Sequence, residues 1–219
     1  MQSNEQEVFS LIEQRILTLK SPYIIGISGA YTSGKTTFSG KLMQYLQSQG
    51  SKVQLIHYDD FHYPFSAIHW GDEKDDEIYT FYKNAFDDSK LIREILLPIK
   101  NKGLLKKNVS CINLGSGQYS NDIRFDVDEK TIVIIEGVLL FRQPLLKFLD
   151  YKIFLDISAD EMLNRGTIRD VPKFGENIIH LYRSRYIPVH HRHMEEDKPK
   201  EVSDMVVDNG DYLNPIVLR

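Results

Sequence analysis

The amino-acid sequence predicts a three-layer α/β/α fold, in which helices cover both faces of a mostly parallel sheet. Two observations favour this fold: short, apolar, β-branched runs recur along the chain, and segments with helical periodicity separate them. Strands that alternate with helices form parallel sheets, because each crossover returns the chain to the same edge of the sheet. The 219 residues suit one domain, and no repeat or linker divides them, so residues 1–219 are expected to fold as a single unit.

Seven segments are predicted as strands because each is short and holds β-branched or aromatic residues. The clearest is 131–135, a continuous β-branched run that suits a strand buried on both faces. Two others lie on either side of a glycine-containing turn at 115–117. In chain order, the predicted strands are residues 23–28, 53–57, 109–114, 118–125, 131–135, 152–156 and 205–207.

Six segments are predicted as helices. The first has apolar residues near the helical period, and Ser21-Pro22 ends it. Pro98 leaves the end of the third helix open, and Pro188 follows the last. The connection 58–78 is long and dense in aromatic and acidic residues, which is typical of a functional loop. In chain order, the predicted helices are residues 5–19, 36–49, 87–100, 144–149, 160–169 and 176–186.

The composition argues against several classes of protein. The formal net charge is −4 and no basic stripe is present, which is atypical of a nucleic-acid binder. The most apolar stretch, 132–141, contains Glu136 and Gly137 and is too short to span a bilayer. The acidic N-terminal residues do not suit a signal peptide. The single cysteine, Cys111, cannot form an internal disulfide, so the sequence favours a cytoplasmic protein that binds neither nucleic acid nor membranes.

Residues 29–36 read Gly-Ala-Tyr-Thr-Ser-Gly-Lys-Thr and match the phosphate-binding pattern G-x-x-x-x-G-K-[ST] in full, between a predicted strand and a predicted helix. The glycines let backbone N–H groups curl toward phosphate oxygens, and the positive end of the next helix faces the same anion. Lys35 is expected to reach the β- and γ-phosphates, and Thr36 to hold Mg²⁺. This indicates a P-loop NTPase fold with an ATP site formed by Gly29, Ala30, Tyr31, Thr32, Ser33, Gly34, Lys35, Thr36 and Thr37.

The loop alone does not specify the reaction, since GTPases, motors and kinases share it. A GTPase would carry N-K-x-D, but Asn101-Lys102 is followed by Gly-Leu. Motor ATPases usually end the second apolar strand in aspartate, whereas this strand ends Ile135-Glu136-Gly137. Neither signature is present, so the reaction has to be inferred from further motifs.

Four segments carry further motifs: residues 24–29, His-Tyr-Asp-Asp-Phe-His-Tyr-Pro at 57–64, Ile-Ile-Glu-Gly-Val-Leu at 134–139 and Leu-Asn-Arg-Gly-Thr-Ile-Arg-Asp at 163–170. Together they resemble the uridine kinase family, whose relatives include nicotinamide riboside kinases, pantothenate kinases and phosphoribulokinases. The stretch 186–208 fits as well, so the resemblance covers most of the chain. It implies transfer of the γ-phosphoryl group of ATP, with Mg²⁺, to a hydroxyl of a nucleoside or similar small molecule.

The resemblance also implies roles for particular residues. Asp59 follows a strand beside the loop, where a carboxylate can take the proton of the attacking hydroxyl, and it is the family's general base. Exchange of roles with Asp60 stays open. The magnesium shell would comprise Thr36, Glu136 and Asp59. Arg165 and Arg169 lie four residues apart on one helical face, in a small lid at 165–176, and can close over the triphosphate. With Lys35, they are the further catalytic groups that the resemblance implies.

The acceptor site is less well defined by the sequence. The candidates for it are Asp60, Phe61, His62 and Tyr82. Tyr82 belongs to an aromatic group that forms either a stacking wall or part of the core: Trp70, Tyr79, Phe81, Tyr82 and Phe86. Gly166 stands where the family has a second lid arginine, and residues 109–114 lack its Tyr-Asp element. The acceptor, the choice between ATP and GTP, and homo-oligomer formation all stay open.

Two other functions also stay open. One is a nucleotide-binding module that regulates or binds a partner without transfer, and the other is an NTPase that drives a protein partner. A clustered set of histidines, His190, His191 and His193, is expected to form a solvated polar face rather than a metal site. Cys111 is expected to be an inert buried thiol.

Overall fold

The computed structural model describes residues 4–19, 23–68 and 77–219. Trp70 and part of the predicted connection 58–78 lie outside the described residues. Within them, no helix is long and apolar enough to cross a membrane.

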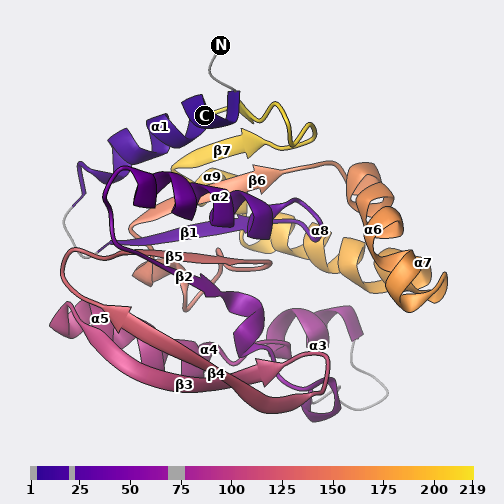
Figure 1. The fold of residues 1–219 in the computed structure, drawn as a ribbon. Helices are drawn as coiled ribbons and strands as arrows, with labels where there is room; N and C mark the ends of the chain where they lie inside the picture. The colour runs from indigo at the N-terminus through magenta and orange to yellow at the C-terminus, as the bar shows by residue number, and fades with distance from the viewer. Residues whose placement is uncertain (1–3, 20–22, 69–76) are drawn as a thin grey trace.

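The central sheet of the described chain has the strand order β2-β5-β1-β6-β7-β8 (Figure 1). All of its neighbouring strands pair in parallel except β7 and β8. The mostly parallel α/β sheet predicted from the sequence is therefore confirmed, and β8 is an added antiparallel edge. The bounds are Val53–His57 (β2), Ile132–Gly137 (β5), Ile24–Gly29 (β1), Tyr151–Asp156 (β6), Met205–Asp208 (β7) and Ile216–Val217 (β8).

Two helices cover one face of this sheet: α1 (Asn4–Ile16) and α2 (Lys35–Ser48). Ile25 and Ile27 of β1 point to that side, whereas Ile24 joins the core on the other side. A strand buried on both faces is mostly apolar, and β1 and β5 are buried at every position with only Ser28 and Glu136 as polar side chains. The other face packs against α3 (Glu77–Asn84), α4 (Asp88–Leu91), α5 (Leu97–Lys102) and α8 (Ile187–Glu196).

A hairpin of β3 (Leu105–Asn113) and β4 (Gln118–Val127) forms a separate two-stranded sheet. Both strands extend beyond the predicted ranges, but the turn lies where the sequence placed it. The buried side chains of Val109, Cys111 and Phe125 attach the hairpin to the core. Burial raises the pKa of the Cys111 thiol to about 11, as suits an inert buried cysteine.

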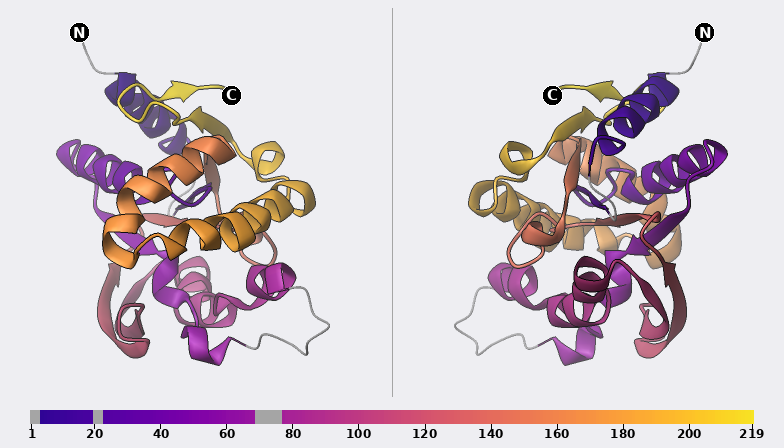
Figure 2. Two further views of the ribbon diagram at one scale, coloured as in Figure 1. Left: turned by 90° about the vertical axis from the view of Figure 1, so that its right-hand side faces the viewer. Right: turned by 90° about the vertical axis from the view of Figure 1, so that its left-hand side faces the viewer.

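The bounds of several predicted helices differ from the structure, and α1, for example, ends at Ile16 rather than at residue 19. The helix predicted to stop at residue 169 continues as α6 (Ala159–Phe174) through Pro172. The one predicted for 176–186 consists of α7 (Asn177–Leu181) and a π-helical turn (Tyr182–Tyr186), and it runs on into α8 because Pro188 occupies the first turn of that helix. In place of the helix predicted for 144–149, the structure has only a 3₁₀ turn, Leu146–Phe148. Figure 2 shows α6 and the continuous helix of α7, the π-helical turn and α8 on one flank of the molecule, and α6 contacts α7 and that turn.

Another prediction that fails is the solvated histidine face, whose residues lie on α8. His193 is 1% exposed, and its Nδ1 pairs with Asp197 Oδ2 at 2.7 Å. Burial also lowers the pKa of His190 to about 3. Only His191 of the three is exposed, because the helix continues past Pro188 and turns the other two inward. The last helix of the described chain is α9 (Pro199–Val202).

Candidate active site

The phosphate-binding loop connects β1 to α2 and depends on two glycines. Gly34 has a φ of 87°, which favours a residue without a side chain. A Cβ on Gly29 would lie 2.5 Å from the carbonyl oxygen of Leu155, so β6 can approach only a glycine there. Thr32 also has a positive φ, of 57°, and its hydroxyl donates to the carbonyl of Met162 at 2.9 Å. The sequence pattern thus produces an anion-binding loop fixed to its neighbours.

The Lys35 ammonium group lies folded against its own loop. Its Nζ donates to the Ala30 carbonyl at 2.6 Å and lies 3.4 Å from Ser33 Oγ. The residue is 7% exposed, and burial lowers the pKa of Lys35 while Glu136 and Asp59 act in the opposite direction. These partners, one carbonyl and one hydroxyl, are neutral, so the buried ammonium group can exchange them for phosphate oxygens.

Two acidic residues meet at the same edge of the sheet because β2 and β5 are parallel neighbours in which His57 is opposite Glu136. Thr36 Oγ1 donates to Glu136 Oε1 at 3.1 Å, and His57 Nδ1 lies 2.6 Å from the same oxygen. Asp59 follows β2 in a 3₁₀ turn, and the charge of Glu136 reaches it. The predicted metal-binding residues are therefore brought together.

Asp59 and Asp60 have different surroundings. Asp59 reaches solvent, but protein packed around it, followed by the charge of Glu136, raises the pKa of its carboxyl group. Lys35 interacts with Asp59 and lowers that pKa in turn. Asp60 instead accepts a hydrogen bond from Asn121 Nδ2 of the hairpin at 3.2 Å. Lys35 of the phosphate-binding loop therefore acts on Asp59, whereas Asp60 contacts the hairpin.

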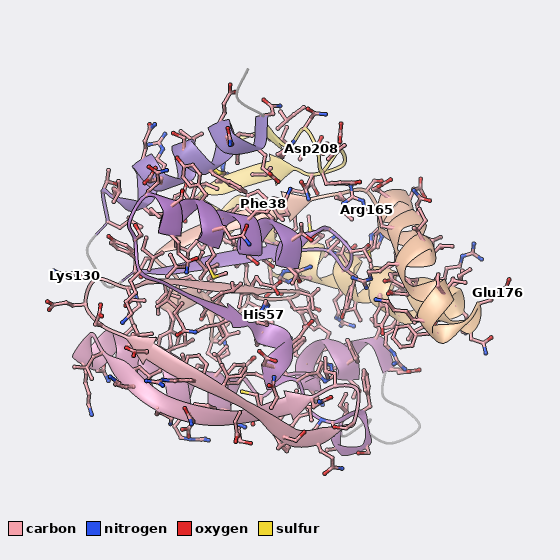
Figure 3. The ribbon with its side chains drawn as sticks, viewed as in Figure 1. Phe38, His57, Lys130, Arg165, Glu176 and Asp208 are labelled. Carbon is pink, nitrogen blue, oxygen red and sulfur yellow. The ribbon has the colours of Figure 1, made fainter. Side chains whose placement is uncertain are left out.

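The two lid arginines occupy one face of α6, as predicted. Arg165 donates to Glu161 Oε1 at 2.6 Å and to the carbonyls of Asn209 and Gly210 at 2.7 and 2.9 Å. Arg169 donates to both carboxylate oxygens of Asp170, at 2.7 and 2.8 Å. Figure 3 places Arg165 beside the ends of the strands, whereas Glu176 lies at the far end of the lid.

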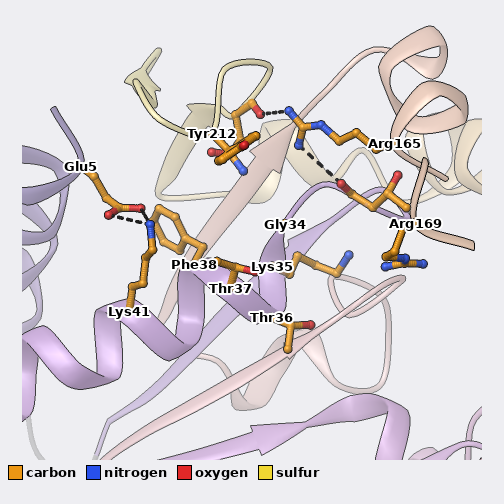
Figure 4. A pocket seen from close by; sticks show the side chains of 12 residues that line it. Glu5, Gly34, Lys35, Thr36, Thr37, Phe38, Lys41, Arg165, Arg169 and Tyr212 are labelled. Atoms are coloured by element: carbon orange, nitrogen blue, oxygen red, sulfur yellow. Dashed lines mark hydrogen bonds and ion pairs between the residues drawn. The ribbon is translucent and has the colours of Figure 1, made fainter. Parts of the chain in front are cut away.

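Both arginines line a cavity of about 320 Å³ above the loop (Figure 4), a volume that suits a small ligand. It extends from Lys35 and Thr36 to an ion pair of Lys41 with Glu5 of α1, whose Nζ–Oε1 distance is 2.8 Å. The sequence analysis did not identify Glu5 and Lys41 as residues of the site. The cavity is lined by Glu5, Thr32, Gly34, Lys35, Thr36, Thr37, Phe38, Lys41, Arg165, Arg169, Asn209 and Tyr212.

Among the acceptor candidates, Phe61 and Tyr82 are 1% exposed and belong to the core. The Tyr82 hydroxyl donates to Asp197 on α8. His62 is 6% exposed and pairs through Nδ1 with the carbonyl of Tyr63, but its charge reaches Asp59. The described residues therefore keep His62 and Asp60 near the site, whereas Phe61 and Tyr82 face away from it.

Packing explains why glycine occupies position 166, where the family has a lid arginine. A Cβ at this position would lie 2.4 Å from the ring of Tyr182, whose hydroxyl donates to Asp170 at 2.7 Å. Glycine is required for the ring to cross α6 and to join the Arg169–Asp170 pair, with 3.3 Å between Arg169 Nη2 and the Tyr182 hydroxyl.

Replacing Gly166 by alanine is therefore expected to destabilise the protein by about 1–3 kcal/mol, because the ring must shift to admit the methyl group. The midpoint of thermal unfolding should fall by about 2–4 °C per kcal/mol. The matched control is Gly40→Ala in α2, where a Cβ meets nothing within 4 Å. That change should raise stability by about 0.5–1 kcal/mol, and equal effects of the two substitutions would contradict the packing argument.

Comparison with known proteins shows similarity to one kinase family. The family model for the phosphoribulokinase / uridine kinase family matches residues 24–195. A uridine kinase from Clostridium perfringens (strain SM101 / Type A) is 30% identical over 204 residues, which cover 89% of this chain and 90% of that protein. A uridine kinase from Chlamydia pneumoniae is 29% identical, covering 89% of this chain and 84% of that protein.

Solved structures show the same fold. A possible uridine kinase from Bacillus stearothermophilus superposes with a TM-score of 0.68 at 21% identity, covering 92% of this chain and 97% of that chain. Phosphoribulokinase from Rhodobacter spheroides superposes with a TM-score of 0.61 at 18% identity, covering 87% of this chain and 71% of that chain. At these identities the likeness concerns the fold alone.

Proposed function

Because the chain belongs to the phosphoribulokinase / uridine kinase family, we propose that it transfers the γ-phosphoryl group of ATP to a hydroxyl of a small-molecule acceptor, as a uridine kinase does. The observation that carries this proposal is the meeting of a buried Lys35 with the carboxylate of Asp59 at one edge of the sheet. A nucleotide-binding module would need only the first of these groups. Phosphoryl transfer to an alcohol needs both.

Each group has a defined task in this reaction. The loop backbone and Lys35 hold the β- and γ-phosphates, and Lys35 exchanges its carbonyl partners for phosphate oxygens. Asp59 accepts the proton of the acceptor hydroxyl while the new P–O bond forms and the bond to ADP breaks. Arg169 lines the cavity beside Lys35 and can stabilise the charge that develops.

The residues present fit a magnesium ion. Thr36 and Glu136 offer oxygens within 3.1 Å of each other, and oxygen is the ligand that Mg²⁺ prefers. No group of three or more His, Cys, Asp or Glu side chains in the described chain is arranged to hold a metal unaided, which suits an ion that binds largely through phosphates and water. Bound there, Mg²⁺ would neutralise charge on the β- and γ-phosphates. Thr36 and Glu136 would hold it, with Asp59 nearby.

We propose a nucleoside or a similar hydroxyl compound as the acceptor, by analogy with the uridine kinases that this chain matches. Asp60 and His62 border the place where it would enter. The buried, unpaired Cys111 thiol also supports the proposal of a cytoplasmic location.

The proposal is tested by ADP release from Mg-ATP over a panel of acceptors: uridine, cytidine, nicotinamide riboside, pantothenate and several sugars. We expect one compound to stimulate release strongly, and a chelator of Mg²⁺ to abolish it. Tight ATP binding with a flat panel would favour the regulatory module instead. Hydrolysis that needs no acceptor and increases with a protein partner would favour the partner-driven NTPase.

A further inference from the structure

Tyr31 is the third residue of the phosphate-binding loop. Its side chain does not line the cavity of about 320 Å³ above the loop, which is called the donor cavity because ATP is proposed to bind there. The neighbouring residues Thr32, Gly34 and Lys35 all do. The loop turns at Thr32, whose positive φ is held by the hydrogen bond to the Met162 carbonyl. The backbone of Tyr31 thus belongs to the phosphate-binding loop, while its ring packs against the segment that follows the lid.

The ring of Tyr31 stacks on Tyr186, with centroids 4.4 Å apart and planes 22° apart. Tyr186 belongs to the π-helical turn after the lid and also contacts Tyr182 edge-on, at 5.2 Å between centroids. On its other side it approaches Phe81, at 6.3 Å. Segments about 150 residues apart therefore meet at Tyr31, next to the reaction centre.

The hydroxyl oxygen of Tyr31 is buried and has no hydrogen-bond partner in the described part of the chain. Burial, followed by the charges of Tyr186 and Asp59, raises the pKa of Tyr31 well above its ordinary value, so the hydroxyl stays protonated and can donate. Asp59 acts on Tyr186 in the same way. A buried hydroxyl without a partner is costly, and a ligand oxygen or an ordered water normally satisfies it.

We propose that Tyr31 is a positioning residue on the acceptor side, whose hydroxyl donates a hydrogen bond to a second oxygen of the acceptor next to the hydroxyl that Asp59 deprotonates. This inference rests on the proposed kinase function. The carbonyl of Ala30, the residue before Tyr31, holds the Lys35 ammonium group, and the charge of Asp59 acts on both Tyr31 and Lys35. An acceptor hydroxyl between Asp59 and the γ-phosphate is therefore expected beside the Tyr31 side chain. The acceptor class is therefore a compound with neighbouring oxygens, such as a vicinal diol, rather than an isolated alcohol.

The test compares Tyr31→Phe with wild type, using the acceptor that the panel identifies and its analogue without the neighbouring oxygen. Loss of one buried donor should reduce kcat/KM for the full acceptor by about tenfold to a hundredfold. The KM for ATP should change by less than about twofold, since the side chain lies outside the donor cavity. The deoxy analogue should react equally well with both enzymes.

The matched control is Tyr45→Phe, which removes a hydroxyl bonded to Glu13 on α1, outside the residues that line the donor cavity, and should leave the kinetics unchanged. Unequal loss on the deoxy analogue, an unchanged kcat/KM, or a weakened affinity for ATP alone would overturn the assignment. A wild-type enzyme that no acceptor stimulates would remove the kinase function and this inference together. An active wild type with an indifferent Tyr31→Phe variant would remove only the inference.

Discussion

Replacing Lys35 by alanine is expected to reduce phosphoryl transfer by at least about a thousandfold. The ammonium group is the cation that the loop itself supplies, and it sits 7% exposed in a site that contains Glu136 and Asp59. Without it, the charge that develops on the γ-phosphoryl group faces two carboxylates with no loop cation between them. The loss should be greater in kcat than in ATP binding, because the backbone N–H groups of the loop still hold the phosphates.

The measurement is kcat and KM from acceptor-dependent ADP release, with thermal unfolding as a check that the variant folds. Lys52→Ala is a suitable control, since Lys52 is exposed and pairs with Asp126 and Asp128 outside the cavity. It should retain wild-type activity. A Lys35→Ala enzyme within about tenfold of wild type would mean that this loop is not the site of transfer.

The part of the site around the phosphates could be predicted from the sequence, because each of its groups belongs to a local pattern. The loop is a contiguous motif, Asp59 follows the end of β2, and Glu136 lies at the carboxyl end of β5. Parallel neighbours end at the same edge, so the two carboxylates had to meet there. The other end of the cavity could not be predicted, because Glu5 and Tyr212 come from opposite ends of the chain and no local pattern indicates that they line one cavity.

The same contrast holds for the fold. Five strands of the central sheet were found from their apolar runs and β8 was missed, whereas helix ends near prolines were misjudged. Pro172 and Pro188 both lie within helices, where tertiary packing outweighs the propensity to stop. Gly166 was noted in the sequence as a departure, and only the ring of Tyr182 above it gives the reason.

Replacing Asp59 by asparagine is expected to reduce kcat by about a hundredfold to ten-thousandfold, the usual contribution of a general base. The amide has the same shape but cannot take the proton of the acceptor hydroxyl. Asp60→Asn is the matched control, because Asp60 faces Asn121 of the hairpin and should keep activity within about tenfold. The reverse order of effects would assign the base to Asp60.

The pH dependence supplies a second, independent readout of Asp59. The protein packed around Asp59 and the charge of Glu136 raise the pKa of this carboxyl group above 3.8, its ordinary value. The base must be deprotonated to act, so kcat/KM should fall as the pH falls through that raised pKa, at a higher pH than for a solvated aspartate. The Asn variant should lack this acidic limb, since it has no proton to gain. An identical limb in both enzymes would show that another group titrates, and Asp59 would then act through its charge near Glu136 rather than as the base.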